Sequence, residues 1–273
     1  VIKGPEILSN IIFSQVESHK IFGGVVPEIA AREHMNRLPG VVEEAVKTAG
    51  IDFSKIDAAA VTYGPGLAGA LIVGLSYAKS LSMALGKDFI AVNHIEAHLL
   101  SPFLEHSGFD YPFLGLVVSG GHTNLYIARG YADYELAAQT RDDAAGEAFD
   151  KAAKMMGLPY PGGPALSGAA KKGDPKKIVF PQAQMKDKSF DFSFSGLKTS
   201  VLYFLKNNRD RIEKGEISIN DVAAAFEKTA SRALVNKIKK LQEKTGITRI
   251  SLSGGVAANL YLKKELAGLA AKK

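Results

Sequence analysis

Two histidines one helical turn apart could bind a metal ion. His94 and His98 frame the segment HIEAH, which follows the strand-like run Phe89–Val92. If the segment is helical, both imidazoles lie on one face with about 5–6 Å between their Cβ atoms. Two imidazoles so placed can share one divalent ion, and the carboxyl end of a strand is where α/β sheets usually bind ligands. A chance pair is the alternative, because the chain contains six histidines.

Two glycine turns, each after an apolar run, are the second candidate for chemistry. The first is Ser119-Gly120-Gly121 within Leu114–Ala128, and the second lies within Ile250–Asn259. Glycine has no Cβ, so backbone N–H groups in such a turn can approach an anion closely. The same pattern also predicts a plain hairpin, and the residues alone leave both interpretations open.

Acidic residues downstream of the first turn form a third set. Asp142 and Asp143 precede the helical pattern AAGEAFDKAAKMMGL, and aspartates at a helix start are expected to cap it. Asp143, Glu147 and Asp150 share one helical face, which is as consistent with a structural stripe as with a ligand face. The following PGGP (161–164) predicts a rigid turn with bare backbone at the surface.

The elements that must position these groups follow from periodicity and turn residues. Besides the two strands around Ser119, we expect strands at Ile56–Tyr63, Phe89–Val92, Tyr131–Ala138 and Ile247–Ser253. We expect helices from Pro27 to Gly50, at Gly66–Leu85, at Asn93–Leu100, at Ser200–Asn207, at Ile219–Lys244 and after Gly254. Lys171–Lys188, rich in lysine and interrupted by prolines, predicts a loop.

Two of these helices carry residues that need an interpretation. Gly66–Leu85 is the most apolar stretch, but Lys79 and several small residues interrupt it, so a buried helix is expected rather than a membrane span. His34, on the helix that begins at Pro27, is expected to be an ordinary polar residue.

Composition narrows the class of protein. Of the 273 residues, 46% are hydrophobic and 23% are charged, as in an ordinary soluble globular protein of one or two domains. The absence of cysteine excludes disulfides and thiolate metal sites, and it suits a cytoplasmic location. The start of the sequence does not read as a signal peptide. The net charge is −4 over residues 1–110 and +10 over residues 111–273, which favours either a polyanionic partner or solvated helix faces.

Seven motifs in one order resemble the bacterial TsaD family, the tRNA threonylcarbamoyladenosine transferases once labelled O-sialoglycoprotein endopeptidases. The motifs are GGVVPEIAAREH, HIEAH, VVSGGHT, DDAAGEAFDK, PGGP, FSFSGLKT and SGGVAAN, and the match runs from about Ser14 to Asn259. The resemblance implies an α/β fold of the actin/sugar-kinase/Hsp70-like (ASKHA) class. Its two α/β domains, here 1–110 and 111–273, would flank a nucleotide cleft.

The resemblance also implies roles for particular residues. His94 and His98 match the family's metal ligands, for Fe²⁺ or Zn²⁺. Asp150 matches the acidic residue near the nucleotide ribose, and Gly163 matches the glycine beside it. The remaining substrate-site positions are Val117, Val118, Ser119, Gly120, Gly121 and Asn259. No catalytic residue is implied.

Two departures from the family pattern concern the ends of the sequence. Family members begin with a strand and an acidic Thr-Ser loop, and they continue into a Thr-Asp-Asn motif whose Asp completes the metal site. This sequence contains neither. We therefore expect an N-terminal domain without its first strand, a C-terminal domain without its end, and a more open, weaker metal site.

The implied activity is transfer of a threonylcarbamoyl group from threonylcarbamoyl-AMP to N6 of adenosine 37, beside the tRNA anticodon. Threonylcarbamoyl-AMP or ATP/ADP would occupy the cleft, and the two imidazoles would face a glycine-floored pocket there. The implied partners are the anticodon stem-loop of tRNA, a degenerate paralogous subunit (TsaB-like) and a small ATPase (TsaE-like), in the cytoplasm and without a membrane.

Three other functions remain open on the sequence. A zinc peptidase usually has Glu directly after the first His, as in H-E-x-x-H, whereas Glu96 lies about 200° around the helix from His94. A kinase or chaperone ATPase of the same fold is the second, because a nucleotide cleft does not select a reaction. The third is a non-catalytic scaffold subunit.

Overall fold

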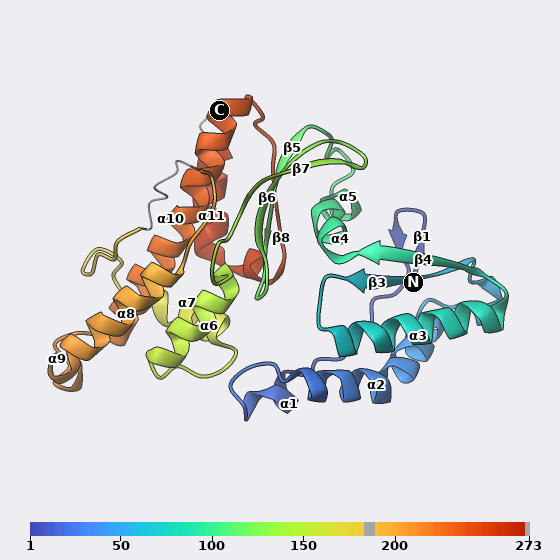
Figure 1. Cartoon of the computed structure of the whole chain (residues 1–273), viewed down its shortest axis with the longest axis horizontal. Helices are drawn as coiled ribbons and strands as arrows, with labels where there is room; N and C mark the ends of the chain where they lie inside the picture. The colour runs from blue at the N-terminus through green and yellow to red at the C-terminus, as the bar shows by residue number, and fades with distance from the viewer. Residues whose placement is uncertain (183–188, 271–273) are drawn as a thin grey trace. The chain divides into compact units, whose positions relative to one another are not determined.

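The computed structural model describes residues 1–182 and 189–270. The chain divides into two compact units, Val1–Ser107 (unit 1) and Gly108–Lys273 (unit 2), where the sequence suggested a boundary after residue 110. Each unit has strands and helices of its own (Figure 1).

Unit 1 is built around two parallel strands joined by a helix. β3 (Ala58–Gly64) pairs with β4 (Asp88–Asn93), and α3 (Ala68–Leu85) connects them, as parallel strands require a crossover. α2 (Pro27–Thr48) packs on α3 and has proline in its first turn, as predicted. The smaller elements are β1 (Ile2–Lys3), β2 (Glu6–Ile7), α1 (Val16–Lys20), η1 (Phe53–Lys55), α4 (His94–Leu100) and α5 (Pro102–Glu105).

The apolar helix α3 is less buried than the sequence predicts. Only Ala78 and Ser82 are buried in it, whereas Ile72 and Met83 are 63% and 83% exposed. The expectation of a buried helix is therefore wrong, because α2 and a two-stranded sheet cover only part of its circumference. Among the described residues, α3 is the one helix long and apolar enough to cross a membrane, a test that core helices of soluble proteins also pass.

Unit 2 is built on a four-stranded sheet with the order β7-β6-β5-β8. β5 (Phe113–Val118), β6 (Thr123–Gly130) and β7 (Asp133–Gln139) are antiparallel neighbours, and β8 (Ile250–Ser253) runs parallel to β5. Val118 pairs with Thr123, so the predicted hairpin closes around residues 119–122. Every residue of β5 is buried.

Helices of unit 2 pack against this sheet and against one another (Figure 1). They are α6 (Ala145–Met155), α7 (Gly162–Ala170), α8 (Ser195–Asn207), α9 (Arg209–Glu213), α10 (Ile219–Thr245), η2 (Gly255–Ala258) and α11 (Leu260–Ala270). Leu114, Leu116 and Leu125 of the sheet share one apolar core with Phe149 of α6 and Phe226 of α10. Burial of such side chains supplies most of the stabilisation of the unit.

Two predicted boundaries in unit 2 need correction. α8 begins at Ser195, five residues before the predicted Ser200, because a side chain distant in sequence caps its first turn. The helix predicted after Gly254 is divided into η2 and α11 at Asn259. Of the predicted loop Lys171–Lys188, residues 171–182 contain neither helix nor strand, and 183–188 lie outside the described residues.

Candidate functional site

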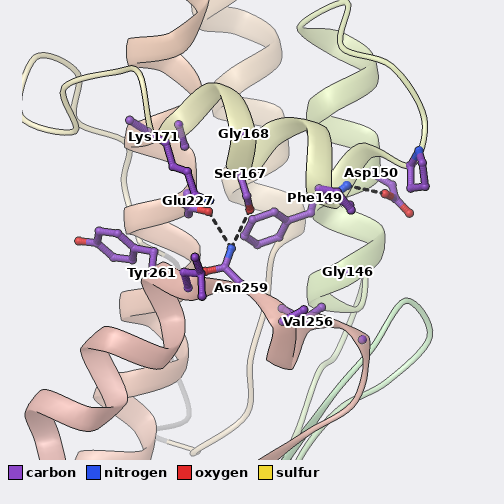
Figure 2. Close-up of a pocket in the computed structure, with 18 of the residues that line it drawn as sticks. Gly146, Phe149, Asp150, Ser167, Gly168, Lys171, Glu227, Val256, Asn259 and Tyr261 are labelled. Atoms are coloured by element: carbon purple, nitrogen blue, oxygen red, sulfur yellow. Dashed lines mark hydrogen bonds between the residues drawn. The ribbon is translucent and has the colours of Figure 1, made fainter.

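A cavity of about 830 Å³ lies within unit 2 (Figure 2). Its walls come from α6, α7, α10, η2 and the start of α11. A volume of this size is typical of sites for nucleotide-sized ligands, roughly 300–1,000 Å³. Elements far apart in the sequence therefore meet around one concave site.

Four of the eight residues expected at a substrate site line this cavity: Gly120, Asp150, Gly163 and Asn259. The other four are not among its lining residues. Val117 and Val118 are fully buried in β5, and Val118 belongs to the apolar core. Ser119 bonds through its backbone to His122 and Gly146. The segment 117–121 thus contributes one lining residue, because the neighbouring positions are committed to the sheet and its turn.

Glycines around the cavity serve two different purposes. A Cβ on Gly254, whose φ is +91°, would lie 2.3 Å from the carbonyl oxygen of Val118, and one on Gly146 would lie 2.6 Å from that of Ser119. These two glycines permit close packing of the two turns and of α6. A Cβ on Gly120 or Gly163 would meet no atom within 4 Å, so those two border open space.

Asp150 joins α6 to the start of α7. Its Oδ1 accepts a hydrogen bond of 3.0 Å from the backbone N–H of Gly163, at the positive end of α7. A Cβ on the buried Gly162 would lie 2.7 Å from Cα of Asp150. The prediction that PGGP brings bare backbone to the surface is therefore wrong at Gly162, which packs on α6. A carboxylate has further lone pairs, so Asp150 can also accept from a ligand hydroxyl.

Ser167, Glu227 and Asn259 form another wall, with Asn259 hydrogen-bonded to the other two (Figure 2). The Nδ2 of Asn259 donates to Glu227 Oε1 at 2.7 Å and to Ser167 Oγ at 2.9 Å. Its Oδ1 accepts from the backbone N–H of Leu262 at 2.8 Å, which caps α11. Burial raises the pKa of Glu227, against the opposing hydrogen bonds from Ser167 and Asn259 and the charge of Lys171.

Sequence reasoning missed Glu227 and Ser167 as residues of the site. Glu227 directly follows five consecutive apolar residues, Val222–Phe226, on a helix whose next turn is also buried. An acidic side chain on a core-facing stretch is costly to bury without a partner or a function. That signal was present in the sequence, whereas its partner residues were not predictable from spacing.

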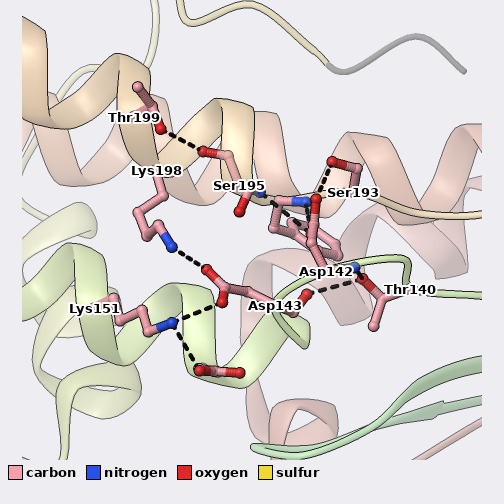
Figure 3. Close-up of polar contacts among 10 residues, drawn as sticks. Thr140, Asp142, Asp143, Lys151, Ser193, Ser195, Lys198 and Thr199 are labelled. Atoms are coloured by element: carbon pink, nitrogen blue, oxygen red, sulfur yellow. Dashed lines mark hydrogen bonds and ion pairs between the residues drawn. The ribbon is translucent and has the colours of Figure 1, made fainter.

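The two aspartates before α6 do not cap that helix (Figure 3). The N-cap of α6 is Ala144, and the N–H groups of Ala145 and Gly146 bond to Thr123 Oγ1 and the Ser119 carbonyl. Asp142 instead accepts from the backbone N–H groups of Phe194 (2.8 Å) and Ser195 (3.3 Å), at the start of α8. The prediction that these aspartates cap α6 is therefore wrong, because Asp142 caps α8 instead.

Asp143 connects α6 to α8 through lysines (Figure 3). It pairs with Lys151 at 2.7 Å and with Lys198, and Lys151 also contacts Glu147 at 2.8 Å. Burial alone would raise the pKa of Asp143, but the two lysines outweigh it and hold this pKa below its usual value. Asp143 and Glu147 therefore form a structural cluster, separate from Asp150 in the cavity wall.

In unit 1, the predicted histidine pair lies on α4. Oδ1 of the N-cap residue Asn93 accepts from the N–H groups of Ile95 and Glu96, which fixes the helix start. The ring centroids of His94 and His98 are 4.5 Å apart with an interplanar angle of 68°. The described residues contain no group of three or more His, Cys, Asp or Glu placed to hold a metal ion. That the pair binds a metal ion, and that it faces the cavity of unit 2, both stay predictions.

His34 lies on α2, also in unit 1. Its Nδ1 is 2.7 Å from the Ala30 carbonyl oxygen and 3.0 Å from Nε2 of Gln15. The residue thus links the helix to the segment before α1, which is a structural role.

Comparison with known proteins gives one consistent result. A family profile described as TsaD, tRNA N6-adenosine threonylcarbamoyltransferase, matches residues 6–272. The chain is 50% identical to the protein of that name from Clostridioides difficile (strain 630), over 98% of this chain and 78% of the relative. It is also 50% identical to that from Geotalea uraniireducens (strain Rf4), over 99% and 78%.

Solved structures define the fold class. The crystal structure of full-length HypF in the phosphate- and nucleotide-bound form matches with a TM-score of 0.61 and 17% identity, over 87% of this chain and 45% of HypF. T. kodakarensis HypF matches with a TM-score of 0.60 and 16% identity, over 85% and 39%. Both have ASKHA-type folds, so the predicted fold class is confirmed. At this identity the likeness shows the fold alone.

Proposed function

The chain belongs to the TsaD family of tRNA N6-adenosine threonylcarbamoyltransferases, and on this premise we propose that the cavity of unit 2 binds the adenylate of the activated donor. Family membership makes the protein an acyltransferase of threonylcarbamoyladenosine synthesis in tRNA. It favours this activity over a peptidase, a kinase or a scaffold. The donor would be threonylcarbamoyl-AMP, and ATP or ADP could occupy the same cavity.

The observation that supports this proposal is the convergence of Gly120, Asp150, Gly163 and Asn259 on one cavity. These residues are separated by up to 139 positions, yet they enclose a volume suited to a nucleotide. The Asp150 carboxylate would accept hydrogen bonds from the ribose hydroxyls. The open space at Gly120 and Gly163 would let the ligand lie against the backbone.

The reaction needs orientation more than activation, because the substrate already carries its leaving group. N6 of adenosine 37 attacks the carbamoyl carbon, the bond from that carbon to the phosphate oxygen breaks, and AMP leaves as N6 loses a proton. The cavity residues would hold the AMP portion so that the carbamoyl carbon is presented in a fixed position. Binding in this way removes most of the translational and rotational entropy that the two reactants would otherwise lose in the reaction step.

Unit 1 would contribute the metal site. We propose that His94 and His98 hold one divalent ion, Fe²⁺ or Zn²⁺, together with a further ligand. When bound, the ion would supply a Lewis acid for oxygen atoms of the donor. The spacing of the two histidines, one turn apart on α4, supports this role.

The proposed partners are the anticodon stem-loop of tRNA, a TsaB-like paralogous subunit and a TsaE-like ATPase, in the cytoplasm. The charge of +10 over residues 111–273 supports a polyanionic partner. A loop base such as adenosine 37 can be splayed out to reach a site, as single-stranded RNA bases often are.

A substitution that fills the cavity tests the proposed function. Gly163→Val adds a side chain where the structure leaves open space, so adenylate binding and transfer to tRNA should both fall. Transfer is measured as threonylcarbamoyladenosine formed from threonylcarbamoyl-AMP and tRNA, with the companion subunits present. Wild-type activity in a Gly163→Val protein that unfolds at the wild-type temperature would place the donor elsewhere.

A further inference from the structure

Glu227 is the buried acidic residue of the cavity to which the proposed function assigns no role. It is 6% exposed, it lines the cavity, and it comes from the first half of α10. Ser167 and Asn259 hold it from α7 and from the start of α11. Three elements therefore fix the position of one carboxyl group.

The amide of Asn259 has no N–H group left to donate to a ligand, because both of its hydrogens are already bonded within the protein. Both hydrogens of Nδ2 have protein acceptors at 2.7 and 2.9 Å, and Oδ1 accepts from Leu262 at 2.8 Å. An Asn amide has two N–H donors and one oxygen with two lone pairs, so both donors and one lone pair are used within the protein. These two bonds hold the side chains of Glu227 and Ser167 in place.

Glu227 and Asp150 lie on opposite sides of the cavity, with Phe149 between them (Figure 2). If Asp150 holds the ribose, as the proposed function has it, the base extends away from Asp150 into the remaining cavity. The cavity surface as a whole is mainly apolar, and Tyr261 and Lys171 are among the residues that line it. The carboxyl of Glu227 is placed to accept a hydrogen bond from the edge of the base.

We propose that Glu227 determines the nucleobase specificity of the site by accepting a hydrogen bond from the 6-amino group of adenine, with Asn259 and Ser167 as positioning residues. This inference rests on the proposed function, because it requires an adenylate in the cavity. Hydrogen bonds to a charged group are stronger than neutral ones, and a partner removed from a buried carboxyl leaves it uncompensated.

Two nucleotides that differ only at position 6 of the base test the proposal. AMP carries the amino group, and purine riboside 5′-monophosphate carries hydrogen instead. Their dissociation constants are measured by calorimetry for the wild-type chain, Glu227→Gln and Glu227→Ala. Asp150→Asn is the matched control, because it changes a carboxylate on the other side of the same cavity.

The wild-type chain should bind AMP at least about 10-fold more tightly than purine riboside monophosphate. Glu227→Gln, which keeps a neutral acceptor, should retain only part of this preference, and Glu227→Ala should lose it. Asp150→Asn should weaken both ligands alike. Asn259→Ala should reduce the preference as well, because it releases Glu227 from its position.

The outcomes separate this inference from the proposed function. If the wild-type chain binds both nucleotides equally, or if Glu227→Gln keeps the full preference, Glu227 does not read the base, although the cavity still binds adenylates. If the wild-type chain binds neither nucleotide, the proposed function fails first. Should Glu227→Ala not fold, the comparison of wild type with Glu227→Gln decides.

Discussion

The histidine pair of unit 1 and the cavity of unit 2 are built in different ways. His94 and His98 come from one short helix and lie four positions apart in the sequence. The cavity residues come from five elements, and hydrogen bonds such as Asn259 to Ser167 span 92 residues. A local pair depends on helix geometry alone, whereas the cavity exists only when the whole of unit 2 is folded.

The largest expected effect tests whether the histidine pair and the cavity have separate roles. His94→Ala should reduce threonylcarbamoyl transfer by about 100-fold, as the loss of a charge-stabilising group does, and it should reduce bound metal. AMP binding in the cavity should stay within about 2-fold of wild type, since His94 is not among its lining residues. Metal content and calorimetry measure the two effects. Equal losses of metal and AMP binding would mean that the sites are one.

Two adjacent glycines show how closely the cavity wall depends on packing. Gly162→Ala should destabilise unit 2 by about 2 kcal/mol, because its Cβ would lie 2.7 Å from Cα of Asp150 and 2.8 Å from Cβ of Ala153. Gly163→Ala should leave stability nearly unchanged, because nothing lies within 4 Å of its Cβ. Urea denaturation of both variants gives the difference. Identical midpoints would contradict the packing described for α7.

Loss of the long-range cap should have a smaller effect. Asp142→Ala removes the acceptor for two N–H groups at the start of α8 and should cost about 1 kcal/mol. Hydrogen exchange of Phe194 and Ser195 should accelerate more than that of residues near Asn207. Asp142→Asn keeps an acceptor and serves as the control, with exchange close to that of wild type.

The smallest expected effect is the pH dependence contributed by Asp143. Lys151 and Lys198 hold the folded-state pKa of this carboxylate below its usual value. Its contribution to the free energy of unfolding is therefore complete when the pH is above the unfolded-state pKa. It is lost as the pH falls through the lower, folded-state pKa. The difference in stability between wild type and Asp143→Asn, about 1 kcal/mol or less at neutral pH since Lys151 is half-exposed, should therefore shrink in acid. A difference that does not change with pH would argue against the ion pairs.

The sequence predicts those features of the fold that local rules determine. Pro27 at the start of α2, the hairpin around Ser119 and the helix that carries His94 all follow from turn residues and periodicity over a few positions. The apolar pattern of Gly66–Leu85 predicts its helix correctly but not its exposure, because exposure depends on how many strands lie beside it.

The candidate site was predictable only in part, because it too depends on contacts between distant parts of the sequence. The resemblance pointed to Asp150, Gly163 and Asn259, but spacing could not show that Asn259 is committed to Glu227 and Ser167. The hydrogen-bond partner of Asp142 was equally unpredictable, since Phe194 lies 52 positions away in the sequence. Contacts of that range are set by topology, and no local pattern encodes them.

The cap that Asp142 provides for α8 implies an order of assembly. A short helix alone in water is marginal, and its first N–H groups need acceptors. For α8 those acceptors arrive only when the loop after β7 has docked beside it, which closes a loop of about 50 residues. We therefore expect the first turn of α8 to be completed only after the β7–α6 connection has docked beside it.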